Sequence, residues 1–366
     1  MDDYRHNVPA SVLQPPPPSM LASSRCLSLS VSMTDTEPDV ALSSQSMSTT
    51  SASGESRFHV NLAGFVGYAR QLMEPINEIS CDGFDEELEE LHRRCMAANL
   101  KQHIYMRSLK MTKKNRYSNI LPYTHTRVVL SEIEKVPDSD YINANYVKAQ
   151  LNGCSTTYIS TQAPIPSTVP DFWRMIWEQK SSIVVMLTPL LEKNMVKSDI
   201  YWPKKLGKLK QFDNGIEICL KSEGRTPDVV TRVFMIRSAE SPNDVRTVTH
   251  IHYLGWPDHS VPISFESYFS VFSLYRSLRE KSTGPVVVHC SAGIGRTGTF
   301  IGCDMALDAF FYILKHGQPT DTICLLDIVY NMRTQRPGMV QTKAQYQFMY
   351  EFLGFCLERR HFNLHI

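Results

Sequence analysis

The fold of this chain is decided by the stretch Pro285-Val286-Val287-Val288-His289-Cys290-Ser291-Ala292-Gly293-Ile294-Gly295-Arg296-Thr297-Gly298. Its three consecutive valines follow a Gly-Pro pair and predict a strand that is buried on both faces of a sheet. From Thr299 the spacing of apolar residues becomes helical, with Phe300, Ile301 and Met305 among small and polar neighbours. A loop with one cysteine, three glycines and one arginine therefore joins a buried strand to a helix.

This loop has the composition of an anion site built around a thiol. Successive backbone N–H groups of a tight glycine-containing loop form a concave nest for an anion, and the N-terminal end of the helix adds positive potential. Cys290 lies where these dipoles converge, so we expect the pKa of its thiol to lie below the free value of about 8.5. The planar guanidinium of Arg296 matches two oxygens of a phosphate. A nucleophile beneath a bound phosphate implies a phospho-cysteine intermediate.

Other residues of the stretch have expected supporting roles. The Thr297 hydroxyl is expected to hydrogen-bond the sulfur and to ease its departure in a second chemical step. His289 is expected to hold the loop rather than to contact the substrate. The backbone N–H groups expected to bind the phosphate belong to Ser291, Ala292, Gly293, Ile294 and Gly295.

Two alternative interpretations of the stretch compete with an anion site. Buried cysteines are usually inert and behave as small apolar residues. The spacing Gly293-x-Gly295-x-x-Gly298 also matches the dinucleotide-binding fingerprint between a strand and a helix. Four residues, 289–292, separate the apolar strand from the first glycine, where that fingerprint requires a direct turn. The acidic residues nearby, Asp304 and Asp308, lie inside the predicted helix rather than after a second strand, which disfavours a nucleotide site.

The run from His289 to Gly298 resembles the signature of the tyrosine-specific protein phosphatases, a family of cysteine-dependent enzymes. Further matches extend from about Lys114 to Tyr346. The resemblance implies an α/β catalytic domain over residues 58–358, with a twisted mixed β-sheet flanked by helices on both faces and the site at the carboxyl end of the signature strand. It also implies an intracellular, non-receptor enzyme that hydrolyses phosphotyrosine in proteins through a phospho-cysteine intermediate, without a metal or another cofactor.

The resemblance assigns roles to residues outside the signature. In the loop of residues 114–122, Tyr117 would stack on the phosphotyrosine ring and make the pocket too deep for phosphoserine. In residues 256–262, Asp258 would protonate the leaving oxygen and then act as the base for the attacking water. In residues 338–346, Gln341 would position that water and Gln345 would assist.

Two further roles implied by the resemblance concern supporting residues. An acidic residue such as Glu192 holds the signature arginine, and a lysine such as Lys197 approaches the acid loop. The alternative for each of these two residues is an ordinary surface salt bridge, which contributes little to stability.

The chain departs from the family pattern at three positions. Asn119 stands where many members have an acidic residue that holds the peptide backbone, and Ala163 and Ser260 stand where glycine is usual. These departures keep open a second function, that of a catalytically weak phosphotyrosine-binding module. A phosphatase for another monoester, such as phosphoserine or a phosphoinositide, is a third possibility, against which Tyr117 argues.

Composition excludes several other classes of protein. The 366 residues include 38 basic and 37 acidic side chains, a balance that argues against a nucleic-acid binder. The nine cysteines have no paired short spacing, so neither a disulfide scaffold nor a zinc site is expected. With no secretory signal and no long uncharged apolar segment, we expect a cytoplasmic protein without membrane insertion. Residues 1–57 are rich in Ser, Thr and Pro and are expected to be a disordered tail, whose partner stays open.

Local patterns predict the remaining elements. Alternating β-branched and aromatic residues predict strands over 126–130, 140–147, 158–162, 182–187, 216–221, 230–237 and 247–254, the last three as an antiparallel meander. Helical spacing predicts helices within 58–100, where Phe65, Tyr68, Leu72 and Ile76 share one face, and over 171–178, 321–334 and 342–357. Ser264 is expected to cap a further helix.

Overall fold

The computed structural model describes residues 56–76, 81–106, 108–257, 260–282, 284–318 and 320–358. The expected disordered tail over residues 1–57 lies outside this part of the chain, apart from its last two residues in a short 3-10 helix, η1 (Ser56–Phe58). Asp258, the expected general acid, also lies outside the described residues.

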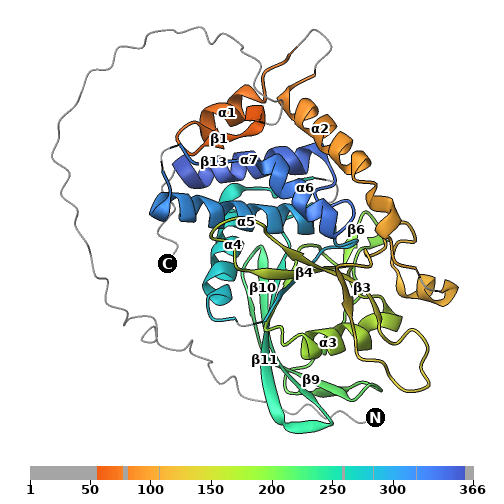
Figure 1. The fold of residues 1–366 in the computed structure, drawn as a ribbon. Coiled ribbons are helices and arrows are strands. Elements are labelled where there is room, and N and C mark those ends of the chain that lie inside the picture. Colours follow the sequence, from red (N-terminus) through yellow and green to blue (C-terminus); the bar gives the residue numbers. More distant parts are fainter. Residues whose placement is uncertain are drawn as a thin grey trace, which may run out of the picture. The chain divides into compact units, whose positions relative to one another are not determined.

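A mixed sheet forms the centre of the described domain (Figure 1). Its strands are β2 (Arg127–Val129), β3 (Tyr141–Lys148), β4 (Thr157–Thr161), β5 (Ile183–Met186), β8 (Leu209–Gln211), β9 (Ile216–Arg225), β10 (Val229–Ser238), β11 (Ser241–Tyr253) and β12 (Val286–His289). Within the described residues these nine strands lie in the order β2-β3-β4-β12-β5-β11-β10-β9-β8. The pairs β4–β12, β12–β5 and β5–β11 are parallel and the other pairs antiparallel, so the predicted mixed sheet is confirmed.

The signature strand β12 lies between β4 and β5 and is buried on both faces. Val286 and Val288 pack into one hydrophobic core, and Val287 packs into the other. Alternate residues of a strand point to opposite faces, so an unbroken run of valines supplies both cores. The prediction of a doubly buried strand is therefore confirmed.

Helices cover both faces of the sheet (Figure 1). One face packs against α3 (Val169–Glu178). The other face packs beneath α1 (Phe65–Gln71), α2 (Gly83–Ala97), α4 (Phe265–Arg279), α5 (Gly295–His316), α6 (Leu325–Gln335) and α7 (Lys343–Glu358). The expected cap of α4 is present, because the Ser264 side chain accepts a hydrogen bond from the Ser267 N–H.

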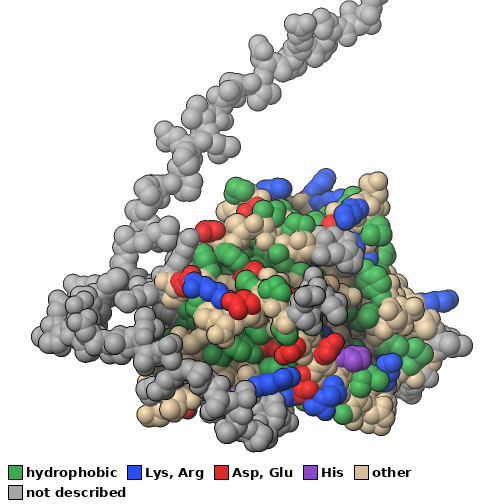
Figure 2. Space-filling view, turned by 90° about the horizontal axis from the view of Figure 1, so that it is seen from above, with side chains coloured by type: hydrophobic (Ala, Val, Ile, Leu, Met, Phe, Trp, Pro, Cys, Tyr) green, Lys and Arg blue, Asp and Glu red, His purple; other side chains and the backbone are tan. Residues whose placement is uncertain are grey.

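The remaining elements are short. They are the 3-10 helices η2 (Leu100–His103), η3 (Leu109–Lys114) and η4 (Pro166–Thr168), the hairpin of β6 (Leu191–Glu192) and β7 (Met195–Val196), and the antiparallel pair of β1 (Val60–Asn61) and β13 (Thr322–Ile323). Charged side chains of both signs are interspersed on the face shown in Figure 2, in keeping with the near-equal totals of the sequence.

Of the described helices, α5 alone is long and apolar enough to cross a membrane, but most of it is buried inside the domain. It carries two carboxylates, Asp304 and Asp308, which form ion pairs with Arg276 and Arg279 of α4. Asp304 is fully buried and also accepts a hydrogen bond from Tyr158. These contacts identify α5 as a core helix held to α4 by a charged cluster.

Several boundary predictions were wrong. β11 begins at Ser241 rather than at residue 247, and β9 continues to Arg225 rather than ending at residue 221, because the added strand ends are exposed and lack apolar alternation. The signature helix begins at Gly295 rather than Thr299, because the tight loop leads directly into its first turn. The helix expected from residue 321 begins at Leu325, because the preceding residues form β13 with a strand far away in the sequence. Ile76 lies beyond α1 and is half exposed, so it does not extend the buried face of that helix.

Candidate functional site

The loop between β12 and α5, residues 290–294, is here called the cysteine loop. It lines a pocket of about 350 Å³ at the carboxyl end of β12, as expected. The other expected site residues that line this pocket are Tyr117, Asn119, Gly295, Arg296, Gln341 and Gln345. Segments from four distant parts of the sequence therefore meet around one cysteine.

Every carbonyl group of the cysteine loop accepts a hydrogen bond from outside the loop. The Cys290 carbonyl accepts from His289 Nδ1, and the Ser291 carbonyl accepts from the Ala163 N–H. Arg336 donates to the Ala292 and Gly293 carbonyls, and the Ser160 hydroxyl also donates to that of Gly293. The Ile294 carbonyl accepts from the N–H groups of Val340 and Gly298. In a planar trans peptide the C=O and the following N–H point in opposite directions. Holding these carbonyls outward therefore turns the N–H groups of residues 291–295 inward, which supports the expected anion nest.

His289 holds the loop, as expected from the sequence. Its Nδ1 lies 3.0 Å from the Cys290 carbonyl oxygen, and its Nε2 lies 2.8 Å from the Tyr201 hydroxyl. Burial lowers the pKa of His289 to about 3, so the ring is neutral. A neutral ring that donates a hydrogen bond from Nδ1 accepts one at Nε2, and the Tyr201 hydroxyl is therefore the donor to Nε2.

Arg336 is a functional residue that the sequence analysis missed. Its guanidinium is fully buried and donates to the carbonyls of Gly293 (2.7 Å) and Ala292 (3.1 Å) and to the side-chain oxygens of Asn145 (2.8 Å) and Asn143 (3.0 Å). Burial lowers its pKa to about 10, while the nearby Cys290 acts in the opposite direction. The two buried asparagines, spaced on one face of β3, were the available signal that a buried donor exists.

The turn of the cysteine loop requires glycine at position 293. Gly293 has φ +71°, and a Cβ there would lie 2.1 Å from the carbonyl oxygen of Thr161. A left-handed conformation is costly for other residues, and a backbone oxygen on the neighbouring strand has no room to move. The close approach of the loop to β4 therefore depends on this glycine.

Cys290 is buried at the base of the pocket and its pKa is lowered. Burial alone would raise the pKa; the Thr297 hydroxyl, the charge of Arg296 and the N–H groups of Thr297 and Ile294 together outweigh it. Thr297 Oγ1 is buried without a well-aligned partner among the described residues, so its effect on the sulfur is that of a nearby dipole. The site thus favours a thiolate.

The signature arginine is fixed from behind. Arg296 donates to both carboxylate oxygens of Glu192, at 2.8 and 3.0 Å, and to Thr188 Oγ1 at 2.8 Å. Both partners of the ion pair are almost fully buried. The expected contact between Glu192 and Arg296 is confirmed, and it orients the guanidinium at the edge of the pocket.

Tyr117 lies at the rim of the pocket, with Asn119 exposed beside it. The Tyr117 hydroxyl lies 2.9 Å from Ser291 Oγ, which donates its own proton to the carbonyl of Lys197 at 2.8 Å. The Tyr117 hydroxyl is therefore the donor to Ser291. Arg116 anchors this rim segment through Ala163, whose N–H binds the cysteine loop, so alanine is accommodated where glycine was usual.

The two expected glutamines lie beside the first turn of α5. A Cβ at Gly295 would lie 2.9 Å from Gln345 Oε1 and 3.2 Å from Gln341 Oε1. Gln345 Oε1 accepts a hydrogen bond from the Gln341 N–H at 2.9 Å. The preceding Val340 has φ +57°, and Arg333 holds its carbonyl at 2.8 Å. This strained segment is thus fixed against the cysteine loop.

The acid loop is described only at its ends. Trp256 is buried and donates from Nε1 to the Ser260 carbonyl at 2.8 Å, which joins the two ends around Asp258. Lys197 is buried and lines the pocket, but the expected approach to the acid loop concerns residues outside the described ranges. The role of Asp258 stays a prediction.

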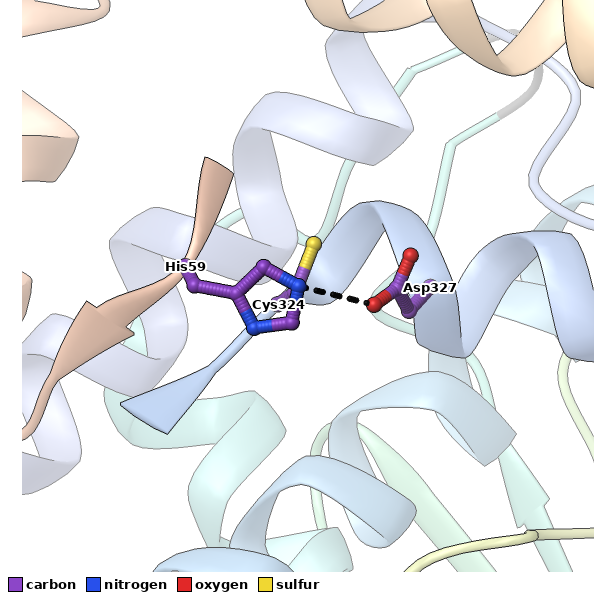
Figure 3. A group of neighbouring side chains, drawn as sticks. All are labelled: His59, Cys324 and Asp327. Atoms are coloured by element: carbon purple, nitrogen blue, oxygen red, sulfur yellow. Dashed lines mark ion pairs between the residues drawn. The ribbon is translucent and has the colours of Figure 1, made fainter. Parts of the chain in front are cut away.

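One group of possible metal ligands lies among the described residues, at β1, β13 and the start of α6 (Figure 3). His59, Cys324 and Asp327 place their ligand atoms within 4.8 Å of one another. Asp327 is already engaged by His59 at 3.3 Å and by Arg94 at 2.7 Å, and burial raises the pKa of Cys324 to about 12. An ion-pair network that ties β1 to α6 accounts for this group without a metal.

Comparisons with known proteins agree with this geometry. A family model described as protein-tyrosine phosphatase matches residues 111–354. The Lar-like tyrosine-protein phosphatase of Caenorhabditis elegans is 41% identical over 238 residues, which cover 65% of this chain and 10% of that protein. Human tyrosine-protein phosphatase non-receptor type 13 is 36% identical over 276 residues, covering 75% of this chain and 10% of that protein. Human receptor-type tyrosine-protein phosphatase F is 40% identical over 246 residues, with coverages of 66% and 12%. The chain spans about a tenth of the length of these curated relatives.

Proposed function

Because the chain belongs to the protein-tyrosine phosphatase family, we propose that residues 58–358 form a catalytic domain that hydrolyses phosphotyrosine in proteins. The observation that carries this proposal is the set of five outward-held carbonyls, which aims consecutive N–H groups at a point above Cys290. Such a ring of donors, closed by a fixed guanidinium, matches the oxygens of a phosphate monoester.

The reaction proceeds in two balanced steps. The Cys290 thiolate attacks phosphorus, the bond to the tyrosyl oxygen breaks, and Asp258 protonates the leaving oxygen. A water held by Gln341 and Gln345 then attacks phosphorus, Asp258 takes its proton, and the P–S bond breaks to release phosphate and the thiolate. The Thr297 hydroxyl stabilises the departing sulfur. Uncatalysed phosphate-monoester cleavage is so slow that enzymes accelerate it by up to ~10²¹-fold. Stabilisation of the transition state by several groups together is therefore needed.

The rim of the pocket supports selectivity for phosphotyrosine. Cys290 is buried at its base while Tyr117 and Asn119 lie at its mouth, so a substrate phosphate must be carried on a long side chain. We expect the aromatic ring of a phosphotyrosine in this pocket to stack on Tyr117. Asn119 offers an amide in place of a carboxylate, and we expect weaker retention of the peptide backbone.

The decisive experiment compares phosphotyrosyl and phosphoseryl peptides of one sequence. The wild-type chain is expected to hydrolyse only the phosphotyrosyl peptide. Cys290→Ser is expected to abolish turnover, and Asp258→Ala to slow turnover while substrate binding is kept. Wild-type binding of the phosphotyrosyl peptide without phosphate release would instead identify a binding module. Full activity of Cys290→Ser would refute the phospho-cysteine mechanism.

We also propose that the domain acts in signalling in the cytoplasm, on phosphotyrosine-containing proteins, without nucleic acid and without membrane insertion. A thiolate nucleophile needs a reducing compartment, and the eight cysteines of the described residues are all unpaired. Most of α5, the described helix that is long and apolar enough to cross a membrane, is buried inside the domain, which supports the proposal of no membrane insertion. The relatives include both receptor and non-receptor phosphatases, so imaging of a fluorescently tagged full chain is the direct test.

A further inference from the structure

A buried carboxylate outside the pocket receives three hydrogen bonds. Glu87 of α2 is only 1% exposed, and its side chain accepts hydrogen bonds from the hydroxyls of Tyr68, Tyr346 and Tyr350. A buried carboxylate is tolerated only when its oxygens are satisfied, and three donors achieve this. The two tyrosines of α7 bind the same oxygen of Glu87, so α2 and α7 are joined by a specific polar contact rather than by apolar packing alone.

This contact lies one residue away from a glutamine of the site. Tyr346 follows Gln345, whose side chain is 4% exposed and accepts the N–H of Gln341 at 2.9 Å. The amide oxygens of both glutamines lie beside Gly295, at the start of α5. The position of Tyr346 on α7 therefore sets where both glutamine side chains lie.

A second contact joins the first turns of the same two helices. Lys343 lies 2.8 Å from carboxylate oxygens of both Asp82 and Asp85, the residues that cap α2. The ring of Phe84 packs edge-on against Tyr346 and Tyr350. The exposed ion pairs contribute little by themselves, but with the buried contacts they fix the start of α7 in direction and in depth.

We propose that α2 braces the glutamine loop, residues 338–345, and that Glu87 is a positioning residue for the hydrolysis of the phospho-cysteine. This inference rests on the proposed function, in which Gln341 and Gln345 hold the attacking water. The helix lies before residue 111, where the match to the family model begins, so the brace is supplied by a segment outside the matched region.

The brace is expected to act on the second chemical step alone. The first step needs Cys290, Arg296 and the cysteine loop, whose carbonyls are held by donors outside α2. Of these donors only the Val340 N–H belongs to the glutamine loop, and the Ile294 carbonyl that it contacts at 3.2 Å is also held by the Gly298 N–H at 2.9 Å. The second step needs a water aligned by the glutamines, and misplacement of an aligned group by about 1 Å costs up to ~10²-fold. Loosening α7 at Tyr346 therefore slows dephosphorylation of the enzyme while leaving its phosphorylation intact.

Pre-steady-state kinetics with an aryl phosphate test this directly. For Glu87→Leu and Tyr346→Phe we expect kcat to fall about tenfold, KM to fall with it, kcat/KM to change less than about twofold, and a burst of aryl alcohol to appear. Glu87→Gln keeps one acceptor and is expected to lie between these variants and the wild type. Tyr350→Phe is the matched control, because it removes a bond to the same Glu87 oxygen one helical turn further from Gln345; its kcat should stay within about twofold.

The results that overturn the brace are equally specific. A parallel fall of kcat and kcat/KM without a burst would show a general loss of native structure, as would equal effects of Tyr346→Phe and Tyr350→Phe. If the wild-type chain releases no phosphate, the proposed function fails, and the contact between α2 and the glutamine loop is then tested separately by amide hydrogen exchange. Faster exchange of residues 338–345 in Glu87→Gln then supports the contact, and unchanged exchange refutes it.

Discussion

Replacement of Arg336 tests whether the cysteine loop is shaped by its carbonyl partners. In Arg336→Met, three buried oxygens lose their donor, those of Ala292, Asn143 and Asn145, while Gly293 keeps the Ser160 hydroxyl. Unsatisfied buried acceptors cost about 1–3 kcal/mol each. Burial of the guanidinium costs roughly 3 kcal/mol, judged from a pKa lowered from 12.5 to about 10, and this cost is relieved. We therefore expect a net loss of about 3 kcal/mol, which a domain of ordinary stability survives.

The effect on activity should exceed the effect on stability. Without Arg336 the peptide planes after Ala292 and Gly293 are less constrained, so the N–H groups of residues 293 and 294 no longer point reliably at the phosphate. Loss of one preorganised donor typically costs about 10²–10³ in kcat, and we expect a fall of about 10². The pKa of Cys290 should also rise toward its ordinary value, because the Ile294 N–H helps to lower it.

Three measurements on one preparation decide the matter. Urea unfolding gives the free energy of unfolding, steady-state hydrolysis of an aryl phosphate gives kcat, and the pH dependence of iodoacetate alkylation gives the pKa of Cys290. Arg336→Lys serves as the control that keeps the charge but not the planar fork. A destabilised Arg336→Met variant with the wild-type thiol pKa and kcat within about threefold would refute carbonyl anchoring as the origin of the anion site.

Other contacts give further expected outcomes. Gly293→Ala should lower the free energy of unfolding by at least ~2 kcal/mol in a urea titration and abolish turnover, because the new Cβ would lie 2.1 Å from the Thr161 oxygen. Glu192→Gln should lower kcat/KM about tenfold and also lower the unfolding midpoint, since the buried Arg296 loses its charged partner; an unchanged kcat/KM would contradict this role. Because the pKa of Cys290 is lowered below 9.0 on folding, its thiolate stabilises the native state above the unfolded pKa, and this contribution is lost as the pH falls through the folded pKa. The difference in unfolding free energy between wild type and Cys290→Ser should therefore grow as the pH rises toward about 9, and a pH-independent difference would show an ordinary thiol.

Local chemistry made the core of the fold predictable. The valine run, the glycine-containing loop and the helical spacing after it are contiguous, and the structure places them as β12, the cysteine loop and α5. Most strands around them were also anticipated to within a few residues, because alternation is a local signal, but the exposed start of β11 at Ser241 was not. The family resemblance then predicted that Tyr117, Gln341 and Gln345 belong to one site, and all three line the same pocket in the structure.

The missed parts of the site depend on contacts between distant segments. Arg336 meets Asn145 across a separation of 191 residues, and Glu87 meets Tyr346 across 259. Nothing in the neighbourhood of either residue in the sequence specifies its partner, since an arginine after a helix and a glutamate in an acidic helix are ordinary surface patterns. The β1–β13 pair was missed for the same reason.

The charged cluster between α4 and α5 has a consequence for the newly made chain. Before it packs against α4, the α5 segment has a length and hydropathy suitable for transfer into a bilayer. Asp304 and Asp308 lie near the middle of that segment, and each opposes transfer into a bilayer by about 2.5–3.5 kcal/mol. The same two carboxylates that bind Arg276 and Arg279 in the folded domain therefore also oppose transfer of the unpacked helix into a bilayer.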